Sequence, residues 1–183
     1  MQKNSSKHKR PFWPDYLVSS VDKIDFMFLE KQGIKAIMID LDGTVVHRGK
    51  FNVSKEVTTS LKQQPIKIYI ATNRPENHSL QNLKKDLHAS GVIHPSGLLG
   101  KPFAHYYKKS LVELGLKPSQ VVMIGDRFLQ DIYGANRAGL TTINVEKLGR
   151  STNPVDYLIS KLEYLHRRKI LKHYRSISDI KVS

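Results

Sequence analysis

The chain has 183 residues, of which 39% are hydrophobic and 25% are charged, and it contains no cysteine. These values are typical of one globular domain with a substantial core, and the missing thiols exclude disulfides, cysteine nucleophiles and cysteine zinc sites. No apolar run approaches the ~20 residues of a membrane-spanning helix, and no apolar segment of a signal peptide follows the basic N-terminus. We therefore expect a cytoplasmic protein.

Positive charge is the unusual property of the composition. The formal net charge is +14 at pH 7, and the excess is concentrated near both ends of the chain. The basic side chains of the two end segments are Lys3, Lys7, Lys9, Arg10, Lys161, Arg167, Arg168, Lys169, Lys172 and Arg175. Because a basic surface attracts polyanions, the expected partners are nucleic acid, an anionic membrane or phosphorylated substrates.

The first predicted element is a helical lead-in over residues 11–33. Its aromatic side chains Phe12, Trp13 and Tyr16 lie next to Lys9 and Arg10 in the sequence. Aromatic rings beside basic residues are typical of a membrane interface. The same rings can instead pack on the core, and the sequence leaves both interpretations open.

The middle of the chain alternates between short apolar runs and helical patterns. The runs are rich in Ile and Val and indicate strands buried on both faces, at residues 35–40, 66–71, 91–93, 120–125 and 141–145. Helices are predicted over residues 54–64, 75–91, 102–115 and 127–139, which carry Ser or Pro at the start or Gly at the end. Strand–helix alternation predicts an α/β fold, a doubly wound parallel sheet with helices on both faces.

A last helix is predicted over residues 153–175, followed by a frayed tail. Its larger apolar face is expected to dock on the sheet and consists of Val155, Leu158, Ile159, Leu162 and Leu165. A second, displaced face lies among basic residues and need not dock; it consists of Ile170, Leu171 and Tyr174. We therefore divide the chain into a lead-in (1–34), a catalytic core (35–165) and a basic C-terminal extension (166–183).

Polar side chains follow the predicted strands at the edge where open α/β sheets bind ligands. The candidates for chemistry are Asp40, Asp42, Thr72, Asn73, Lys101, Asp126 and Asp131. This combination of carboxylates, a hydroxyl, an amide and an amine suits the transfer of a phosphoryl group. Four other side chains near these positions are assigned to the surface: His47, Arg48, His78 and His105.

The carboxylates are candidates for attack, proton transfer and metal binding. Asp40 can attack phosphorus and form an aspartyl-phosphate. Asp42 can protonate the leaving oxygen and later activate water. Two negative groups approach each other only with a cation present, and Mg²⁺ prefers oxygen ligands. Asp40 and Asp126 can supply two of these ligands, and a backbone carbonyl near Asp42 a third.

The remaining candidates would bind the phosphoryl group. The Thr72 hydroxyl and the Asn73 amide can donate hydrogen bonds to its oxygens, and Lys101 can neutralise its charge. Gly43 and Thr44 support the site, because the glycine permits a tight turn or a close approach of the backbone.

Four segments of the sequence together resemble the motifs of the haloacid dehalogenase superfamily. They are "DLDGT", "ATN", "KP" and "GDRFLQD", in this order along residues 35–131, and the match extends to about residue 165. The resemblance implies a Mg²⁺-dependent phosphatase with the roles described above, Asp40 as nucleophile and Asp42 as acid and base. It also implies that Asp131 is an outer acidic residue that holds either Lys101 or a metal-bound water.

The spacing of the motifs limits what can cover the site. Only 27 residues separate Thr44 from Thr72, and 28 separate Thr72 from Lys101. Each gap already contains a predicted helix, so no cap domain fits and the site is expected to be open. An open site suits a phosphate on a large substrate, such as a lipid head group, a nucleic-acid end or a protein.

The whole chain resembles the capless subfamily IIIA phosphatases, which are related to the phosphatidylglycerophosphate phosphatases. Two positions depart from that branch: Gly43 replaces its usual Asn, and Thr72 its usual Ser. The resemblance implies hydrolysis of phosphatidylglycerophosphate to phosphatidylglycerol. The basic and aromatic end segments favour an anionic lipid at the inner face of a membrane over nucleic acid as partner. The alternatives are a phosphatase for a nucleotide, a sugar phosphate or a nucleic-acid end, and a non-catalytic RNA- or ribosome-associated protein.

Overall fold

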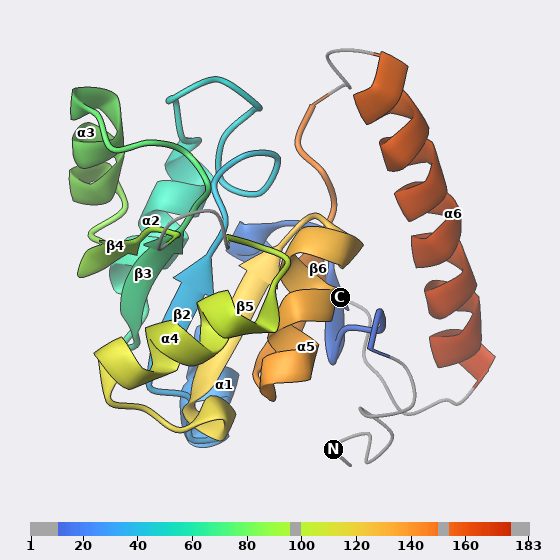
Figure 1. The fold of residues 1–183 in the computed structure, drawn as a ribbon, viewed down its shortest axis with the longest axis horizontal. Helices are drawn as coiled ribbons and strands as arrows, with labels where there is room; N and C mark the ends of the chain where they lie inside the picture. Colours follow the sequence, from blue (N-terminus) through green and yellow to red (C-terminus); the bar gives the residue numbers. More distant parts are fainter. Residues whose placement is uncertain (1–10, 96–99, 150–153, 177–183) are drawn as a thin grey trace.

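The computed structural model describes residues 11–95, 100–149 and 154–176, so the basic residues 1–10 and residues 177–183 of the predicted frayed tail (176–183) lie outside the described part. A parallel six-stranded sheet has the order β1-β6-β5-β2-β3-β4, with helices on both faces (Figure 1). The strands are β1 Tyr16–Val18, β2 Ala36–Ile39, β3 Lys67–Ala71, β4 Gly91–Ile93, β5 Val121–Gly125 and β6 Thr141–Val145. The predicted doubly wound α/β fold is confirmed, and the described residues form no cap domain.

The helices are α1 Phe26–Lys31, α2 Lys55–Gln63, α3 His78–Asp86, α4 Ala104–Leu114, α5 Gly134–Ala138 and α6 Pro154–Ser176. Short helical turns occupy Val21–Lys23 and Pro118–Gln120, and a π-helical segment, Phe128–Tyr133, leads into α5. Ser54 caps α2 as expected, since its side chain accepts a hydrogen bond from the Val57 N–H. The start of α3 was predicted too early at Pro75, because Asn77 caps this helix by accepting from the Leu80 N–H.

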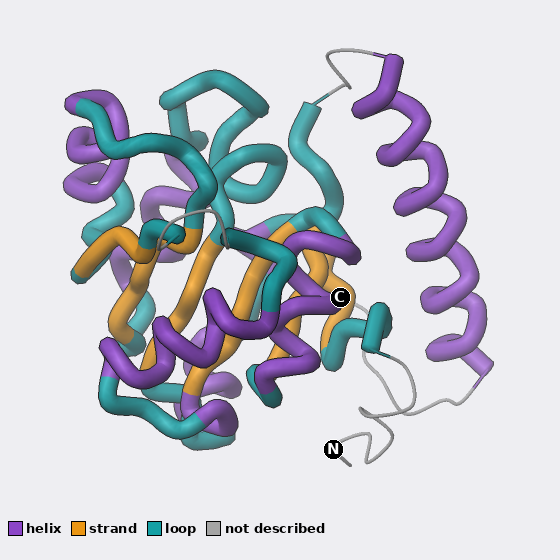
Figure 2. The backbone as a smooth tube through the Cα atoms, viewed as in Figure 1, coloured by secondary structure: helices purple, strands orange, loops and turns teal. Residues whose placement is uncertain are grey.

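Alternate side chains of the strands point to opposite faces of the sheet and form two apolar layers. Ile37 and Ile39 of β2 pack in one layer, with apolar side chains of α1, α2 and α3. Met38 of the same strand packs in the other layer, with side chains of α4 and α5. Both faces of the central strands are therefore covered, which explains why their sequences are apolar throughout (Figure 2).

The prediction of a helical lead-in is wrong for most of residues 11–33. Tyr16–Val18 forms the edge strand β1, which pairs with β6 and places Tyr16 opposite Ile143. The side chain of Asp15 holds the start of this pairing by accepting a hydrogen bond from the Thr142 N–H at 2.8 Å. An aromatic and a β-branched residue around a buried Leu17 suit a strand better than a helix, and only Phe26–Lys31 is α-helical.

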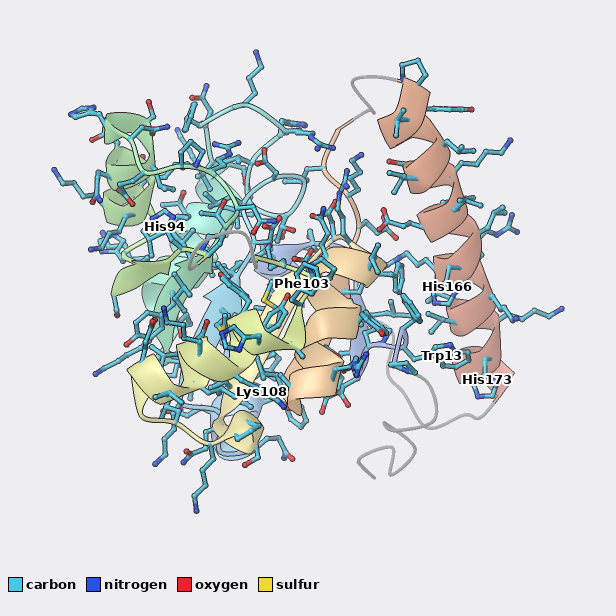
Figure 3. All side chains as sticks on the ribbon, viewed as in Figure 1. Trp13, His94, Phe103, Lys108, His166 and His173 are labelled. Carbon is cyan, nitrogen blue, oxygen red and sulfur yellow. The ribbon has the colours of Figure 1, made fainter. Side chains whose placement is uncertain are left out.

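The aromatic side chains of the lead-in contact other parts of the protein. Phe12 stacks on Tyr133 with ring centroids 4.5 Å apart. Trp13 lies edge-on to His173 near the end of α6, with centroids 4.8 Å apart (Figure 3). Of the two interpretations of these rings, the structure therefore favours packing on the protein.

Helix α6 docks by a face other than the predicted one. The larger apolar face faces solvent, with exposed fractions between 38% and 68% for Val155, Leu158, Ile159, Leu162 and Leu165. Ile170 of the second face is fully buried instead, in a cluster with Leu17, Phe128 and Ile132. The expectation that the first face docks on the sheet is wrong, and the predicted boundary after residue 165 falls inside this helix.

Polar side chains of α6 explain this orientation. Glu163 accepts a hydrogen bond from the Phe128 N–H at 3.1 Å, and Arg167 donates one to the Val18 carbonyl oxygen at 2.9 Å. These backbone groups lie at the end of β1 and the start of the π-helical segment, so polar contacts join α6 to both elements. Apolar periodicity carries no information on such contacts. No helix within the described ranges is both long enough and apolar enough to cross a membrane.

Replacing Glu163 by Gln should stabilise the protein at alkaline pH. Burial raises the pKa of Glu163 from 4.5 to about 7, so the folded state loses stability as pH rises through this range. Glu163→Gln keeps an acceptor for the Phe128 N–H without the charge. We expect the free energy of unfolding, measured with urea, to rise by roughly 1–3 kcal/mol relative to the parent at pH 8, and little at pH 4.5. An equal difference at both pH values, or the same gain from the exposed control Glu30→Gln, would contradict this.

Candidate functional site

The residues predicted to act on phosphate meet at the carboxyl edge of the sheet. A pocket of about 220 Å³ opens there, and it is lined by Asp40, Asp42, Arg48, Thr72, Asn73, Arg74, Lys101, Arg127 and Gln130. Asp126 and Asp131 are buried beside it, and one oxygen of each lies within 4.8 Å of one oxygen of Asp40. The structure thus brings all seven candidates together, since parallel strands end at one edge.

The turn after β2 presents the two aspartates of this strand. Asp40 still belongs to the ladder, because its N–H donates to the Ile124 carbonyl oxygen at 2.9 Å. The next residue, Leu41, is fully buried. Gly43 then adopts a φ of +86°, and a Cβ at this position would lie 2.5 Å from an Asp126 carboxylate oxygen. The glycine therefore allows both the turn and the close approach of Asp126.

Lys101 is the cation at the centre of the site. Its buried Nζ lies 2.5 Å from Asp40 Oδ1 and 2.7 Å from Asp131 Oδ1. Burial alone would lower the pKa of Lys101, but the carboxylates of Asp131 and Asp40 raise it well above its usual value. The resemblance left two roles open for Asp131, contact with Lys101 or with a metal-bound water, and the structure shows the contact with Lys101.

Three buried carboxylates fit a divalent cation at this site. Burial raises the pKa of Asp40 to about 6 and the pKa of Asp126 well above its usual range. Asp126 Oδ2 is buried and has no hydrogen-bond partner among the described residues. A cation would stabilise all three carboxylates, and oxygen donors are those that Mg²⁺ prefers. The Asp42 side chain lies outside this group of three. The ligand predicted from this part of the chain therefore remains a backbone carbonyl near Asp42.

Asp42 is held by an arginine that the sequence analysis missed. Arg74 Nε donates to Asp42 Oδ2 at 2.7 Å, and Arg74 Nη2 donates to Oδ1 at 2.5 Å. The Gly49 N–H also donates to Oδ1, at 2.9 Å. Burial would raise the pKa of Asp42, but the hydrogen bonds from Arg74 and Gly49 hold it below its usual value. The sequence did contain a signal, since Arg74 directly follows Thr72 and Asn73 at the same sheet edge.

The other predicted residues hold the loops of the site in place. The buried Thr72 hydroxyl accepts from the Arg74 N–H at 3.0 Å. Asn73 contacts the backbone of Lys101 twice, accepting from its N–H at 3.3 Å and donating to its carbonyl oxygen at 3.4 Å. Thr44 Oγ1 donates to Asp126 Oδ1 at 3.3 Å. The phosphate contacts predicted for Thr72 and Asn73 stay predictions.

Three further residues of the site came only from the structure. Arg48, which the sequence analysis assigned to the surface, lines the pocket, and so does Arg127. The backbone N–H of Arg127 also donates to Asp131 Oδ2 at 3.1 Å. Asn144 of β6 donates to the Asp126 carbonyl oxygen at 2.9 Å and so fixes the loop that carries this aspartate.

Comparisons with known proteins show which families and folds the chain is similar to. A haloacid dehalogenase-like hydrolase family matches residues 37–99, and a HAD-hydrolase-like family matches residues 98–156. The crystal structure of an uncharacterized protein from Listeria monocytogenes superposes with a TM-score of 0.52 over 66% of this chain and 85% of its own. Its sequence identity of 19% supports a likeness of fold alone.

Several curated relatives are phosphatases by name. Probable phosphatase YqeG of Bacillus subtilis is 28% identical over 166 residues, which are 89% of this chain and 91% of that protein. Glyceraldehyde 3-phosphate phosphatase of Pyrococcus furiosus is 42% identical over only 43 residues, which are 24% of this chain and 18% of that protein. The chain therefore has the fold of the haloacid dehalogenase-like hydrolases and has phosphatases among its relatives.

Proposed function

We propose that the chain is a Mg²⁺-dependent phosphomonoester hydrolase that acts through an aspartyl-phosphate on Asp40. The observation that carries this proposal is the contact of Lys101 with Asp40, beside a buried Asp126 oxygen that has no hydrogen-bond partner among the described residues. Phosphoryl transfer of this kind uses a nucleophilic carboxylate, a fixed positive charge and a metal ion. Asp40 would supply the first, Lys101 the second, and the Asp126 oxygen would help to bind the third.

The contacts of the site assign a task to each residue. Lys101 binds Asp40 Oδ1, so we assign the attack on phosphorus to Oδ2. Lys101 and the Thr72 hydroxyl would stabilise the negative oxygens of the transferred group. Mg²⁺, held by Asp40 and Asp126, would supply further neutralisation of this charge.

Asp42 would transfer the protons in both steps. In the first step the P–O bond to the leaving group breaks, and the leaving oxygen takes a proton from Asp42. In the second step Asp42 takes a proton from water, whose oxygen displaces Asp40 from phosphorus. The bidentate contact with Arg74 fixes the orientation of the carboxylate for both transfers. The lowered pKa of Asp42, due to the hydrogen bonds that oppose burial, favours the second.

For the substrate we propose phosphatidylglycerophosphate in an anionic membrane surface. An open pocket without a cap supports a phosphate on a large substrate, and the resemblance to the subfamily IIIA phosphatases supports this lipid. The solvent-exposed apolar face of α6 supports contact with a bilayer, because exposed basic side chains lie along the same helix: Lys161, Arg168, Lys169 and Lys172. Trp13 and Tyr16 carry no part of this proposal, since both pack on the protein.

Asp40→Asn should abolish phosphate release. The amide is a far weaker nucleophile and metal ligand, so we expect a loss of at least ~10³-fold in kcat, measured as Mg²⁺-dependent release of inorganic phosphate. Removal of divalent cations with EDTA should have a similar effect. The exposed Asp86→Asn is the matched control and should keep the parent rate. Hydrolysis by Asp40→Asn at the parent rate would contradict the mechanism.

A substrate panel tests the lipid assignment. Phosphatidylglycerophosphate in anionic vesicles should have a higher kcat/KM than a nucleotide, a sugar phosphate or an oligonucleotide with a terminal phosphate. Faster cleavage of any soluble ester would replace the lipid by that class of substrate. A parent protein that hydrolyses none of them, while it binds RNA in a salt-dependent way, would support the non-catalytic alternative.

The apolar face of α6 gives a separate prediction. The double substitution Leu158→Glu and Leu162→Glu introduces two negative charges into this exposed face. We expect vesicle binding, measured by co-sedimentation, to fall about 10-fold or more, while hydrolysis of a soluble ester stays unchanged. Val112→Glu is the control, because Val112 is 80% exposed on α4 and lies outside this face. Unchanged vesicle binding by the double variant would remove α6 from the proposal.

A further inference from the structure

The pocket beside Asp40 contains more arginine than the transfer of one phosphoryl group uses. Lys101 and Thr72 already account for the transferred group, and Asp40 and Asp126 for a cation. Arg48, Arg74 and Arg127 line the same pocket. Arginine is the side chain best suited to bind carboxylate and phosphate oxygens, because its planar fork can donate two parallel hydrogen bonds.

Arg74 is fixed in position and incompletely satisfied. Its guanidinium lies over the Phe51 ring, 4.7 Å from the centroid, and Nη2 also donates to the Lys50 carbonyl oxygen at 3.1 Å. Nε and Nη2 bind Asp42, whereas Nη1 is buried and has no acceptor among the residues that the structure describes. A buried donor without an acceptor costs free energy, which an acceptor on a ligand would remove.

We infer that Arg74, with Arg48 and Arg127 in the same pocket, forms a subsite for a second anionic group of the substrate. The preferred substrates are then phosphomonoesters that carry another negative charge a few atoms from the phosphate that is cleaved. The inference rests on the proposed phosphatase function but not on a membrane. A phosphodiester and a carboxylate share the chemistry that this subsite recognises, and a phosphatidylglycerophosphate head group contains the former.

Soluble substrate pairs test the subsite. Glycerol 3-phosphate and glycerophosphoglycerophosphate differ by a phosphodiester, and glyceraldehyde 3-phosphate and 3-phosphoglycerate differ by a carboxylate. At fixed ionic strength we expect kcat/KM to be about 10-fold or more higher for the two-anion member of at least one pair. The pair that shows the preference identifies the anion. No preference in either pair would overturn the inference.

Variants of Arg74 separate recognition from support of Asp42. Arg74→Gln should reduce the ratio of kcat/KM between the two-anion and the one-anion substrate to near one. Arg74→Lys should retain part of this ratio, because lysine keeps the positive charge but not the planar pair of donors. An Arg74 that only orients Asp42 would instead lower kcat equally for all four substrates, and that result would overturn the inference. Arg137→Gln, which removes one exposed arginine of α5 outside the pocket, is the control for net charge and should keep the preference.

A binding measurement separates failure of the subsite from failure of the proposed function. Calorimetry on the Asp40→Asn protein with the same compounds needs no turnover. We expect the two-anion compounds to bind about 10-fold more tightly, and the double variant Asp40→Asn, Arg74→Gln to lose this difference. Equal affinities would overturn the subsite. Absence of turnover by the parent protein with preserved selectivity in binding would overturn only the phosphatase function.

Discussion

The site depends on the ammonium group of Lys101 between two buried carboxylates. A buried charge is tolerated only when it is paired, and Lys101 meets this condition through Asp40 and Asp131 at 2.5 and 2.7 Å. The carboxylate of Asp126 is buried close to both of them, and burial raises its pKa well above the usual range. A divalent cation would stabilise the charged form of all three carboxylates, so the same group of side chains that fixes the loops would also suit such an ion.

Strand order explains how distant residues reach this cluster. β2 lies between β5 and β3, so Asp40 at the end of β2 has Asp126 on one side and Thr72 on the other. Lys101 arrives on the loop before α4 and is held there by the Asn73 side chain. Apolar strands buried on both faces thus do more than form the core, because their rigid ends keep the charged groups at fixed separations.

The sequence predicted those parts of the molecule that follow from local patterns. Five strands and the positions of Asp40, Thr72 and Asp126 follow from apolar runs and from the polar residues at their ends. The edge strand β1 was missed, although the equally short β4 was predicted, because Tyr16–Val18 lies within a longer segment that was interpreted as helical throughout. The docking face of α6 was wrong, since Glu163 and Arg167 bind backbone groups far away in the sequence. Pairing of Arg74 with Asp42 likewise spans 32 positions and leaves no periodic signal.

The polar docking of α6 has a consequence for the site. A second cleft is lined by Asp126 together with Ser160 and Glu163 of α6, so this helix lies directly beside the proposed cation site. Because the helix docks through polar contacts and through Ile170, the larger apolar face defined above stays exposed to solvent. A substrate with a charged head and an apolar body would therefore meet arginines in the pocket and apolar side chains on the neighbouring helix. This arrangement would need no cap domain, because the membrane or other surface that carries the substrate would itself limit the access of water to the pocket.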